Sequence, residues 1–270
     1  MNESLLQIAI KAALESGQDI MKIYNRDFTI AYKEDSSPLT EADLTANKTI
    51  MKYLMPTNIP IISEENKQLD YNERKHWESC WIVDPLDGTK EFVKKNDEFT
   101  VNIALVNNGK LLLGVIYAPA LKLLYFTNED KSAAFRIEVK DSDALDGNMF
   151  NENNAIHPSK SRRSDIKVVA SRSHLNEATT KFIENIKDYD KVEMVSKGSS
   201  LKFCLVAEGK ADLYPRFAPT MEWDTAAGQA ICEAVGLQVL DLSTQKPMVY
   251  NRANLLNNHF LVSKNGTSIS

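Results

Sequence analysis

The chain has 270 residues, of which 43% are hydrophobic and 26% are charged, and its formal net charge at pH 7 is −5. This composition is ordinary for a globular protein, and the length is enough for one large domain or two modest ones. A negative charge without a lysine–arginine block argues against a broad basic face, so we expect no nucleic-acid polymer as a partner.

The sequence predicts a cytoplasmic protein without a transmembrane segment. No apolar run approaches the ~18 residues of a membrane span, and the N-terminus lacks the pattern of a signal segment. Peripheral association with the inner face of the cell membrane and assembly into a homodimer are left open. The cysteines are odd in number and lack CxxC spacing, which indicates no disulfides; they are Cys80, Cys204 and Cys232. The four histidines form no HxxxH pair, so oxygen ligands, and with them magnesium or manganese, are favoured over zinc.

The predicted elements alternate between helices and strands, as in α/β or α+β proteins built in layers. In the N-terminal half we expect, in order, a helix over residues 4–24, a short strand within 28–33, a helix over 41–54 capped by Thr40, strands at 61–63 and 81–83, and a hairpin from 99 to 117. In the C-terminal half we expect a strand at 166–170, a helix over about 176–187, a helix ended by Gly209, a strand at 211–214, and a helix from about Glu222 stopped by Gly236. Residues 128–165 are polar and irregular, and we interpret them as the joint between two lobes.

The stretch from Trp81 to Phe92 carries the clearest chemical signal. A buried strand is expected to end at Asp84-Pro85, because proline cannot donate to the ladder. Asp84 and Asp87 then flank a tight turn, and Gly88 and Thr89 follow, with Thr89 a favoured residue for a helix N-cap. Acids that hold a metal would thus lie beside backbone N–H groups that face a phosphate. Asp-Pro and Asp-Gly are also ordinary turn dipeptides, so this stretch alone leaves a plain turn open.

Further acids occur where other elements begin or end. Glu64 and Glu65 follow the strand at 61–63, Asp224 lies near a helix start, and Asp43 lies in a first helical turn, where it could also simply complement the helix dipole. If these ends meet, the carboxylates and the Leu86 carbonyl could hold two divalent ions that clamp both oxygens of a phosphoryl transfer. No Ser/His/Asp order or activated cysteine is apparent, so we expect no protein nucleophile.

Three motifs in this order resemble the inositol monophosphatase superfamily: Glu64-Glu65 after an apolar strand, Asp84-Pro85-Leu86-Asp87-Gly88-Thr89, and Trp223-Asp224-Thr225-Ala226-Ala227-Gly228. Within it the chain is more similar to the 3′(2′),5′-bisphosphate nucleotidases of bacterial sulfur assimilation, in the segments 81–105, 198–209 and 214–217. The resemblance implies a layered αβαβα sandwich: a single phosphatase unit over 1–270, with a metal-binding α+β lobe at about 1–135 and an α/β lobe on the nucleotide side at 165–270.

The resemblance also implies a lithium-sensitive hydrolase with two or three Mg²⁺ ions, for which Mn²⁺ can substitute. Metal-activated water would convert adenosine 3′,5′-bisphosphate to AMP and phosphate, with 3′-phosphoadenylyl sulfate as a second substrate. One metal would be held by Glu64, Asp84 and the Leu86 carbonyl, and another by Asp84, Asp87 and Asp224. Asp43 and Thr89 match the pair that orients and deprotonates the water, Glu65 would assist through a further metal or water, and the Gly88 and Thr89 N–H groups would receive the scissile phosphate.

The second phosphate of such a substrate needs a cation, and the candidates are Lys202 and Arg216, for which solvated surface charges are the alternative. Ser171, Arg172 and Ser199 would line the nucleotide side. Two other functions are left open. One is an inositol monophosphatase or fructose bisphosphatase on the same scaffold, and the other is a metal-dependent sensor that binds a phosphometabolite without turnover.

Overall fold

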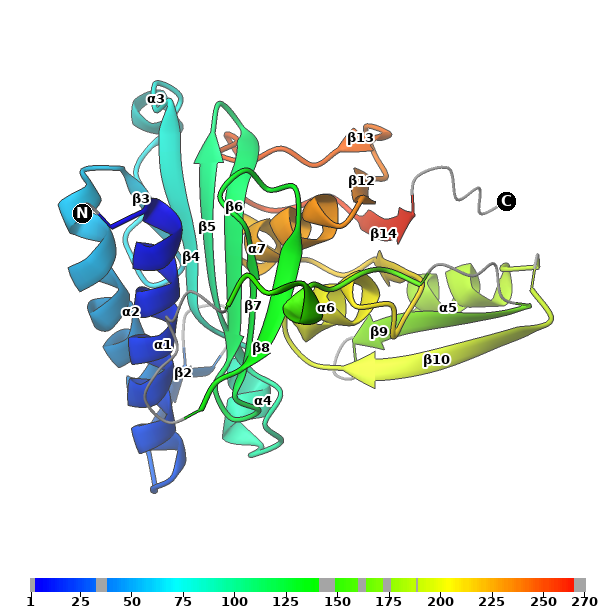
Figure 1. Ribbon diagram of the computed structural model, residues 1–270, viewed down its shortest axis with the longest axis horizontal. Helices are drawn as coiled ribbons and strands as arrows, with labels where there is room; N and C mark the ends of the chain where they lie inside the picture. Colours follow the sequence, from blue (N-terminus) through cyan, green and yellow to red (C-terminus); the bar gives the residue numbers. More distant parts are fainter. Residues whose placement is uncertain are drawn as a thin grey trace.

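The computed structural model describes residues 3–32, 38–140, 149–159, 164–171, 176–187 and 189–264. Its elements form layers (Figure 1), in the order of a helix pair, a large sheet, a second helix pair, a set of shorter strands and a last helix. This layered α/β arrangement confirms the predicted fold class. No helix of the described ranges is both long and apolar enough to cross a lipid bilayer.

The first layer is the pair α1 (Leu5–Tyr24) and α2 (Glu41–Leu54), which pack on each other and on one face of the large sheet. Both helices begin with a capping box, formed by Ser4 with Gln7 and by Thr40 with Asp43. The small pair β1 (Ile30–Tyr32) and β2 (Pro38–Thr40) leads into α2. Because caps and apolar spacing are local signals, the sequence predicted both helices to within one residue.

The large sheet has six strands in the order in which they occur along the chain. They are β3 (Ile61–Ser63), β4 (Ser79–Asp87), β5 (Thr100–Asn107), β6 (Lys110–Ala118), β7 (Leu123–Thr127) and β8 (Ala134–Glu138). β3 runs parallel to β4, and the other neighbours are antiparallel. The predicted hairpin is β5–β6, turning at Asn108 and Gly109, whose φ angles are 47° and 76°. β8 lies within the stretch 128–165 that we interpret as polar and irregular, where the sequence did not place the run from Phe135 to Val139. Pairing with β7 holds residues 134–138 extended.

Two local expectations about the Asp84 stretch are wrong. Strand β4 continues through Pro85 to Asp87, because the ladder with β5 shifts register between Asp84 and Asp87 and this irregularity accommodates the proline. The N-cap of the short helix α4 (Thr89–Val93) is Gly88, at φ 91°, rather than Thr89. The Thr89 side chain is therefore available for other contacts.

The second helix pair, α6 (Leu201–Ala207) and α7 (Glu222–Ala234), lies between the large sheet and the shorter strands (Figure 1). The shorter strands are β9 (Asp165–Ser171), β10 (Lys191–Lys197), β11 (Tyr214–Arg216), β12 (Leu237–Asp241), β13 (Lys246–Pro247) and β14 (Phe260–Lys264). Helix α5 (Glu177–Glu184) packs on β9 and forms the last layer. The remaining short pieces are η1 (Met55–Thr57), α3 (Tyr71–Arg74) and η2 (Glu152–Asn154).

The strand expected at 211–214 instead pairs from Tyr214 to Arg216 with β14. Pro215 is tolerated there because β11 is the end strand of its four-stranded sheet. An isolated bridge between Val168 and Leu213 joins this sheet to β9.

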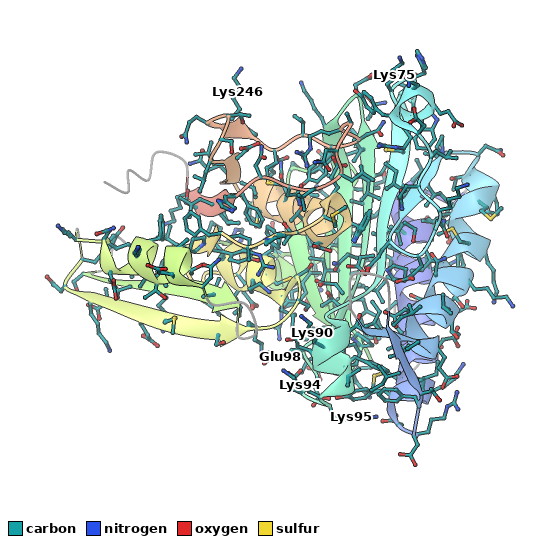
Figure 2. All side chains as sticks on the ribbon, turned by 180° about the vertical axis from the view of Figure 1, so that it is seen from behind. Lys75, Lys90, Lys94, Lys95, Glu98 and Lys246 are labelled. Atoms are coloured by element: carbon teal, nitrogen blue, oxygen red, sulfur yellow. The ribbon has the colours of Figure 1, made fainter. Side chains whose placement is uncertain are left out.

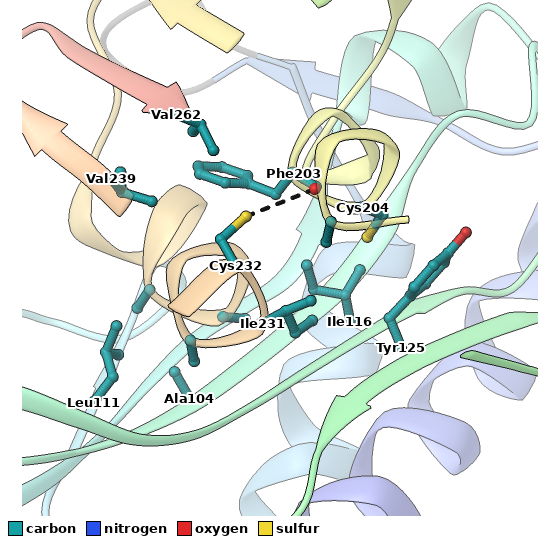
Figure 3. Packing of buried hydrophobic residues seen from close by; sticks show 14 of the residues in the cluster. Ala104, Leu111, Ile116, Tyr125, Phe203, Cys204, Ile231, Cys232, Val239 and Val262 are labelled. Carbon is teal, nitrogen blue, oxygen red and sulfur yellow. Dashed lines mark hydrogen bonds between the residues drawn. The ribbon is translucent and has the colours of Figure 1, made fainter. Parts of the chain in front are cut away.

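Small residues let α7 lie directly on the large sheet and on α6. A Cβ at Gly114 of β6 would lie 2.6 Å from the Ala227 carbonyl oxygen, and one at Gly228 would lie 2.4 Å from the Phe203 ring. Figure 3 shows the packed interior here: the Phe203 ring of α6 points toward Val239 and Val262, and Cys232 of α7 lies beside Phe203. These close approaches hold α7, which carries Asp224, against the sheet that carries Asp84.

Candidate active site

Three carboxylates from two parts of the chain meet at the end of β4. Each of Asp84, Asp87 and Asp224 offers one oxygen, and these three oxygens lie within 4.8 Å of one another. The side chain of Asp84 is buried, with 1% of its surface exposed. The sequence predicted that these acids converge, and the register shift in β4 together with the packing of α7 explains how they do.

Backbone N–H groups hold the first and last of these acids. Asp84 Oδ1 accepts a hydrogen bond from the Leu86 N–H at 3.1 Å, within the irregular end of β4. Asp224 Oδ2 accepts one from the Met221 N–H at 2.8 Å, as the third residue of α7. Each side chain is therefore oriented before any cation arrives.

The electrostatics of this cluster favour a bound cation. Burial, followed by the charges of Glu64 and Asp87, raises the pKa of Asp84 well above its ordinary value. Burial and the charge of Asp87 raise the pKa of Asp224 to about 8, and Glu64 adds to this shift. Glu64 therefore lies near the cluster, although it is not among the three acids whose oxygens lie within 4.8 Å of one another. Crowded carboxylates that resist ionisation and offer only oxygen atoms fit a hard divalent ion, which would neutralise their repulsion.

A second group, formed by Asp43, Thr89 and Glu65, adjoins the first. The Thr89 hydroxyl donates to Asp43 Oδ1 at 3.2 Å and is 3.3 Å from the Leu86 carbonyl oxygen. Asp43 Oδ2 accepts from both the N–H and the hydroxyl of Thr40, each at 2.7 Å. Burial raises the pKa of Asp43, and the charge of Glu65 contributes to that shift. The capping box of α2 thus holds Asp43 in place beside Thr89.

The sequence did not single out the residues that hold Asp87. Its Oδ2 accepts from the Ser200 N–H at 2.6 Å and from the Ser200 hydroxyl at 2.7 Å. Asn102 Nδ2 in turn donates to Ser200 Oγ at 2.7 Å. A signal was present, because Thr100 and Asn102 place polar side chains on a strand whose other members are mostly apolar and buried. This pattern indicated that Thr100 and Asn102 have a role as buried polar residues, but it did not show which side chains they contact.

The residues expected on the nucleotide side lie close to these acids where the structure describes them. Lys202 is only 5% exposed, which contradicts a solvated surface charge, and its ammonium donates to the Ser199 carbonyl at 2.5 Å. The Arg216 guanidinium donates to the Ala218 and Pro219 carbonyls, both at 3.2 Å. Burial lowers the pKa of Lys202; the charge of Asp87 opposes this shift and the charge of Arg216 adds to it. The side chain of Ser171, and all of Arg172, lie outside the described residues.

Gly88 makes a close approach between the two halves of the site. A Cβ at Gly88 would lie 3.1 Å from the Glu98 carbonyl oxygen and 3.2 Å from Ser199 Cβ. Beyond it, Lys90 and Lys94 extend from α4 near Glu98 (Figure 2) and are exposed.

The comparisons with known proteins agree with this geometry. The family model described as "Inositol monophosphatase family" matches residues 1–267. The chain belongs to the inositol monophosphatase family. Enzymes of this family use divalent metal ions, and the acidic cluster of this member is the kind of site that such ions require.

Relatives within the family cover nearly the whole chain. The chain is 40% identical over 267 residues to the 3′(2′),5′-bisphosphate nucleotidase CysQ of Salmonella typhimurium, covering 96% of this chain and 99% of that protein. It is 34% identical to the protein of the same name from Haemophilus influenzae, covering 97% and 93%. A crystal structure of CysQ from Bacteroides thetaiotaomicron superimposes with a TM-score of 0.85 at 45% identity, covering 96% and 97%. An inositol monophosphatase from Thermotoga maritima, at 24% identity and a TM-score of 0.73, shares the fold.

Proposed function

We propose that this chain is a magnesium-dependent 3′(2′),5′-bisphosphate nucleotidase that hydrolyses the 3′-phosphate of adenosine 3′,5′-bisphosphate to give AMP and phosphate. 3′-Phosphoadenylyl sulfate is proposed as a second substrate. The observation that carries the proposal is the meeting of Asp84, Asp87 and Asp224 beside the Thr89–Asp43 pair. The names of full-length relatives at 40% identity support the choice of substrate.

The acids divide naturally into two sets of metal ligands. Glu64, Asp84 and the Leu86 carbonyl would hold one ion, and Asp84, Asp87 and Asp224 would hold another, while Glu65 would assist a third. Oxygen-only donors favour Mg²⁺, with Mn²⁺ as a substitute. Bound ions of this kind supply Lewis acidity and neutralise the charge of the transferring phosphoryl group.

Thr89 and Asp43 would position and deprotonate the attacking water. Because the Thr89 hydroxyl donates to Asp43 Oδ1, the lone pairs of Thr89 Oγ1 can accept a hydrogen bond from that water. As the water oxygen bonds to phosphorus, the bond between phosphorus and the ribose 3′ oxygen breaks. The proton of the water would pass to Thr89 Oγ1 while the threonine proton passes to Asp43 Oδ1, and the departing 3′ oxygen would take up a proton from solvent. The two Thr40 donors on Asp43 Oδ2 prevent rotation of the carboxylate, so the accepting oxygen stays aimed at Thr89.

The cationic side of the site would bind the phosphate that is not cleaved. Lys202 and Arg216 lie near the acids. Burial lowers the pKa of Lys202, and the charges of Asp87 and Asp224 oppose that shift, while the charge of Arg216 counteracts the rise in the pKa of Asp224 that burial causes. Ser199 Oγ is buried without a hydrogen-bond partner among the described residues, and it would donate to the nucleotide. The N–H groups of Gly88 and Thr89 would face the scissile phosphate. We place the enzyme in the cytoplasm, where the three buried cysteines would stay reduced.

A phosphate-release assay tests the proposal. We expect the protein with Mg²⁺ to hydrolyse adenosine 3′,5′-bisphosphate in preference to inositol 1-phosphate, and to be inactive after chelation of the metal. Preference for the inositol ester would assign the alternative phosphatase activity. Tight, metal-dependent binding of the nucleotide without release of phosphate would assign a sensor instead.

A further inference from the structure

One carboxylate oxygen of Asp87 is engaged entirely by the protein. Asp87 Oδ2 accepts from Ser200 N–H at 2.6 Å and from Ser200 Oγ at 2.7 Å, and longer contacts reach it from Asn102 Nδ2 at 3.4 Å and Thr100 Oγ1 at 3.5 Å. Two short donors already use the lone pairs of one carboxylate oxygen. Oδ1 is therefore the oxygen that Asp87 can offer to a cation.

The hydroxyl of Ser200 is used in an unusual way. Ser200 occupies the N-cap position of α6, where a serine side chain ordinarily accepts a hydrogen bond from its own helix, but its side chain makes no such bond. The Asn102 amide donates to Ser200 Oγ at 2.7 Å, so the hydroxyl proton is directed away from Asn102. Of its two acceptors, Asp87 Oδ2 at 2.7 Å is closer than the Asp224 carbonyl oxygen at 3.0 Å.

This network joins separate elements. Asp87 ends β4, Asn102 lies on β5, Ser200 begins α6, and Asp224 lies in the first turn of α7. Ser200 and Asn102 are 2% and 1% exposed, so water cannot easily replace either partner. Hydrogen bonds among buried polar groups of this kind fix side-chain positions more firmly than exposed hydrogen bonds do.

We propose that Ser200, oriented by Asn102, is a positioning residue that occupies Asp87 Oδ2 and thereby makes Asp87 a one-oxygen ligand of the divalent metal. The inference rests on the proposed metal-dependent function. Asp84 and Asp224 are each held by a backbone N–H, whereas Asp87 is held by both an N–H and a hydroxyl. The hydroxyl adds the constraint that a carboxylate at an irregular strand end otherwise lacks.

The test is the metal affinity of Ser200→Ala without substrate. This variant keeps the Ser200 N–H contact and removes only the hydroxyl. Loss of a residue that orients a ligand typically weakens metal binding about 10–100-fold, and we expect a loss of at least about 10-fold by calorimetric titration with Mg²⁺ or Mn²⁺. Ser16→Ala is the matched control, because Ser16 is also buried and donates a single hydrogen bond, to the Ala13 carbonyl at 3.1 Å within α1. Its metal affinity should equal that of the unmodified protein.

A second variant separates positioning from general destabilisation. Asn102→Ala should also weaken metal binding. Combining it with Ser200→Ala should cost little more than Ser200→Ala alone, because Asn102 acts mainly through the Ser200 hydroxyl at 2.7 Å and its direct contact with Asp87 Oδ2 is long, at 3.4 Å. Metal affinities within twofold of the unmodified protein in both single variants would overturn the inference. That outcome differs from failure of the proposed function, in which the unmodified protein itself would bind no divalent ion and release no phosphate.

Discussion

Each oxygen of Asp87 has a different task, which makes this residue sensitive to a change of a single atom. In Asp87→Asn, the new amide can lie in two orientations. If its oxygen accepts from Ser200, its NH₂ group faces the metal and cannot bind it. If its oxygen faces the metal, its NH₂ group faces the N–H and the hydroxyl of Ser200, which are both donors. We expect kcat/KM to fall by about 10²–10³-fold, the usual cost of removing one group that stabilises the transition-state charge. The fold should survive, because Asp87 is only partly buried.

Phosphate release and thermal unfolding of Asp87→Asn, measured side by side, check this expectation. Activity equal to that of the unmodified protein would remove Asp87 from the metal site.

Lys202 gives the nucleotide side a distinct pH dependence. Burial lowers the pKa of its ammonium to about 8, with the charge of Arg216 acting in the same direction. Above that pH the side chain loses the charge that would bind the second phosphate. We therefore expect the KM for adenosine 3′,5′-bisphosphate to rise between about pH 7 and about pH 9. Lys202→Arg should flatten this rise, because arginine keeps its charge throughout.

The control for Lys202 is a substrate with one phosphate, such as 3′-AMP. Its KM should change less over the same range, and an equal rise for both substrates would contradict the assignment.

The Lys202 ammonium also affects folding. Its pKa is about 8 in the folded chain and 10.5 as its ordinary value, so between these values the unfolded chain holds a proton that the folded chain has released. The free energy of unfolding that Lys202 contributes therefore increases as pH rises from about 8 toward 10.5.

At the scale of elements, the sequence predicted well those helices and strands that local signals define. It did not predict the strands whose formation depends on pairing with a distant segment. The limits of α1 and α2 follow from caps and apolar spacing, which the sequence displays directly. The run that forms β8 could not be placed, and β10 was missed, because the extended form of both depends on partner strands. β10 also has a largely exposed surface without clean alternation. Pro85 likewise suggested a strand end, whereas the register shift allows the strand to continue.

The candidate site shows the same division. The acids that were expected to converge lie together at the end of β4, because each belongs to a motif that marks the end or the start of an element. What they bind stays a proposal. Ser200 and Asn102 could not be assigned from the sequence, since a polar residue on a buried strand or at a helix start does not reveal which distant side chain it contacts.

The packing of α7 on β6 should control the geometry of the metal site. In Gly114→Ala the new Cβ would lie 2.6 Å from the Ala227 carbonyl oxygen, so the helix must move away from the sheet. Overpacking of this kind costs about 1–3 kcal/mol in the free energy of unfolding. Because Asp224 moves with α7 while Asp84 stays with the sheet, we also expect weaker binding of Mg²⁺.

Gly236→Ala is the control for that variant. It strains a residue at φ 81° beyond the other end of α7, yet its Cβ would meet no atom within 4 Å. We expect it to lose stability, by about 1–2 kcal/mol, without losing metal affinity. Unfolding in denaturant and metal titration of both variants separate the two effects, and equal metal affinities would show that α7 does not set the geometry of the site.

For the whole molecule, the buried acids make folding and metal binding depend on pH together. The pKa of Asp224 is about 8 in the folded, metal-free protein and 3.8 as its ordinary value. Between these values the folded state holds a proton that the unfolded chain has released. The contribution of protonated Asp224 to the stability of the folded state is therefore fully present below about pH 3.8 and is lost as pH rises through about 8. Asp84 and Asp43, whose pKa values are also raised, act in the same direction.

A divalent ion must displace these protons, so its binding should strengthen as pH rises. We expect the increase in Tm caused by excess Mg²⁺, relative to a chelator, to grow from about pH 6 to about pH 8, and calorimetry in two buffers should detect released protons. Three other acids do not titrate between pH 6 and pH 8, because their pKa values are lowered from 3.8; they are Asp19, Asp130 and Asp241. Asp224→Asn, which cannot titrate, should reduce both the gain in Tm and its pH dependence. A gain in Tm that is constant with pH would show that the crowded carboxylates are already ionised before the metal binds.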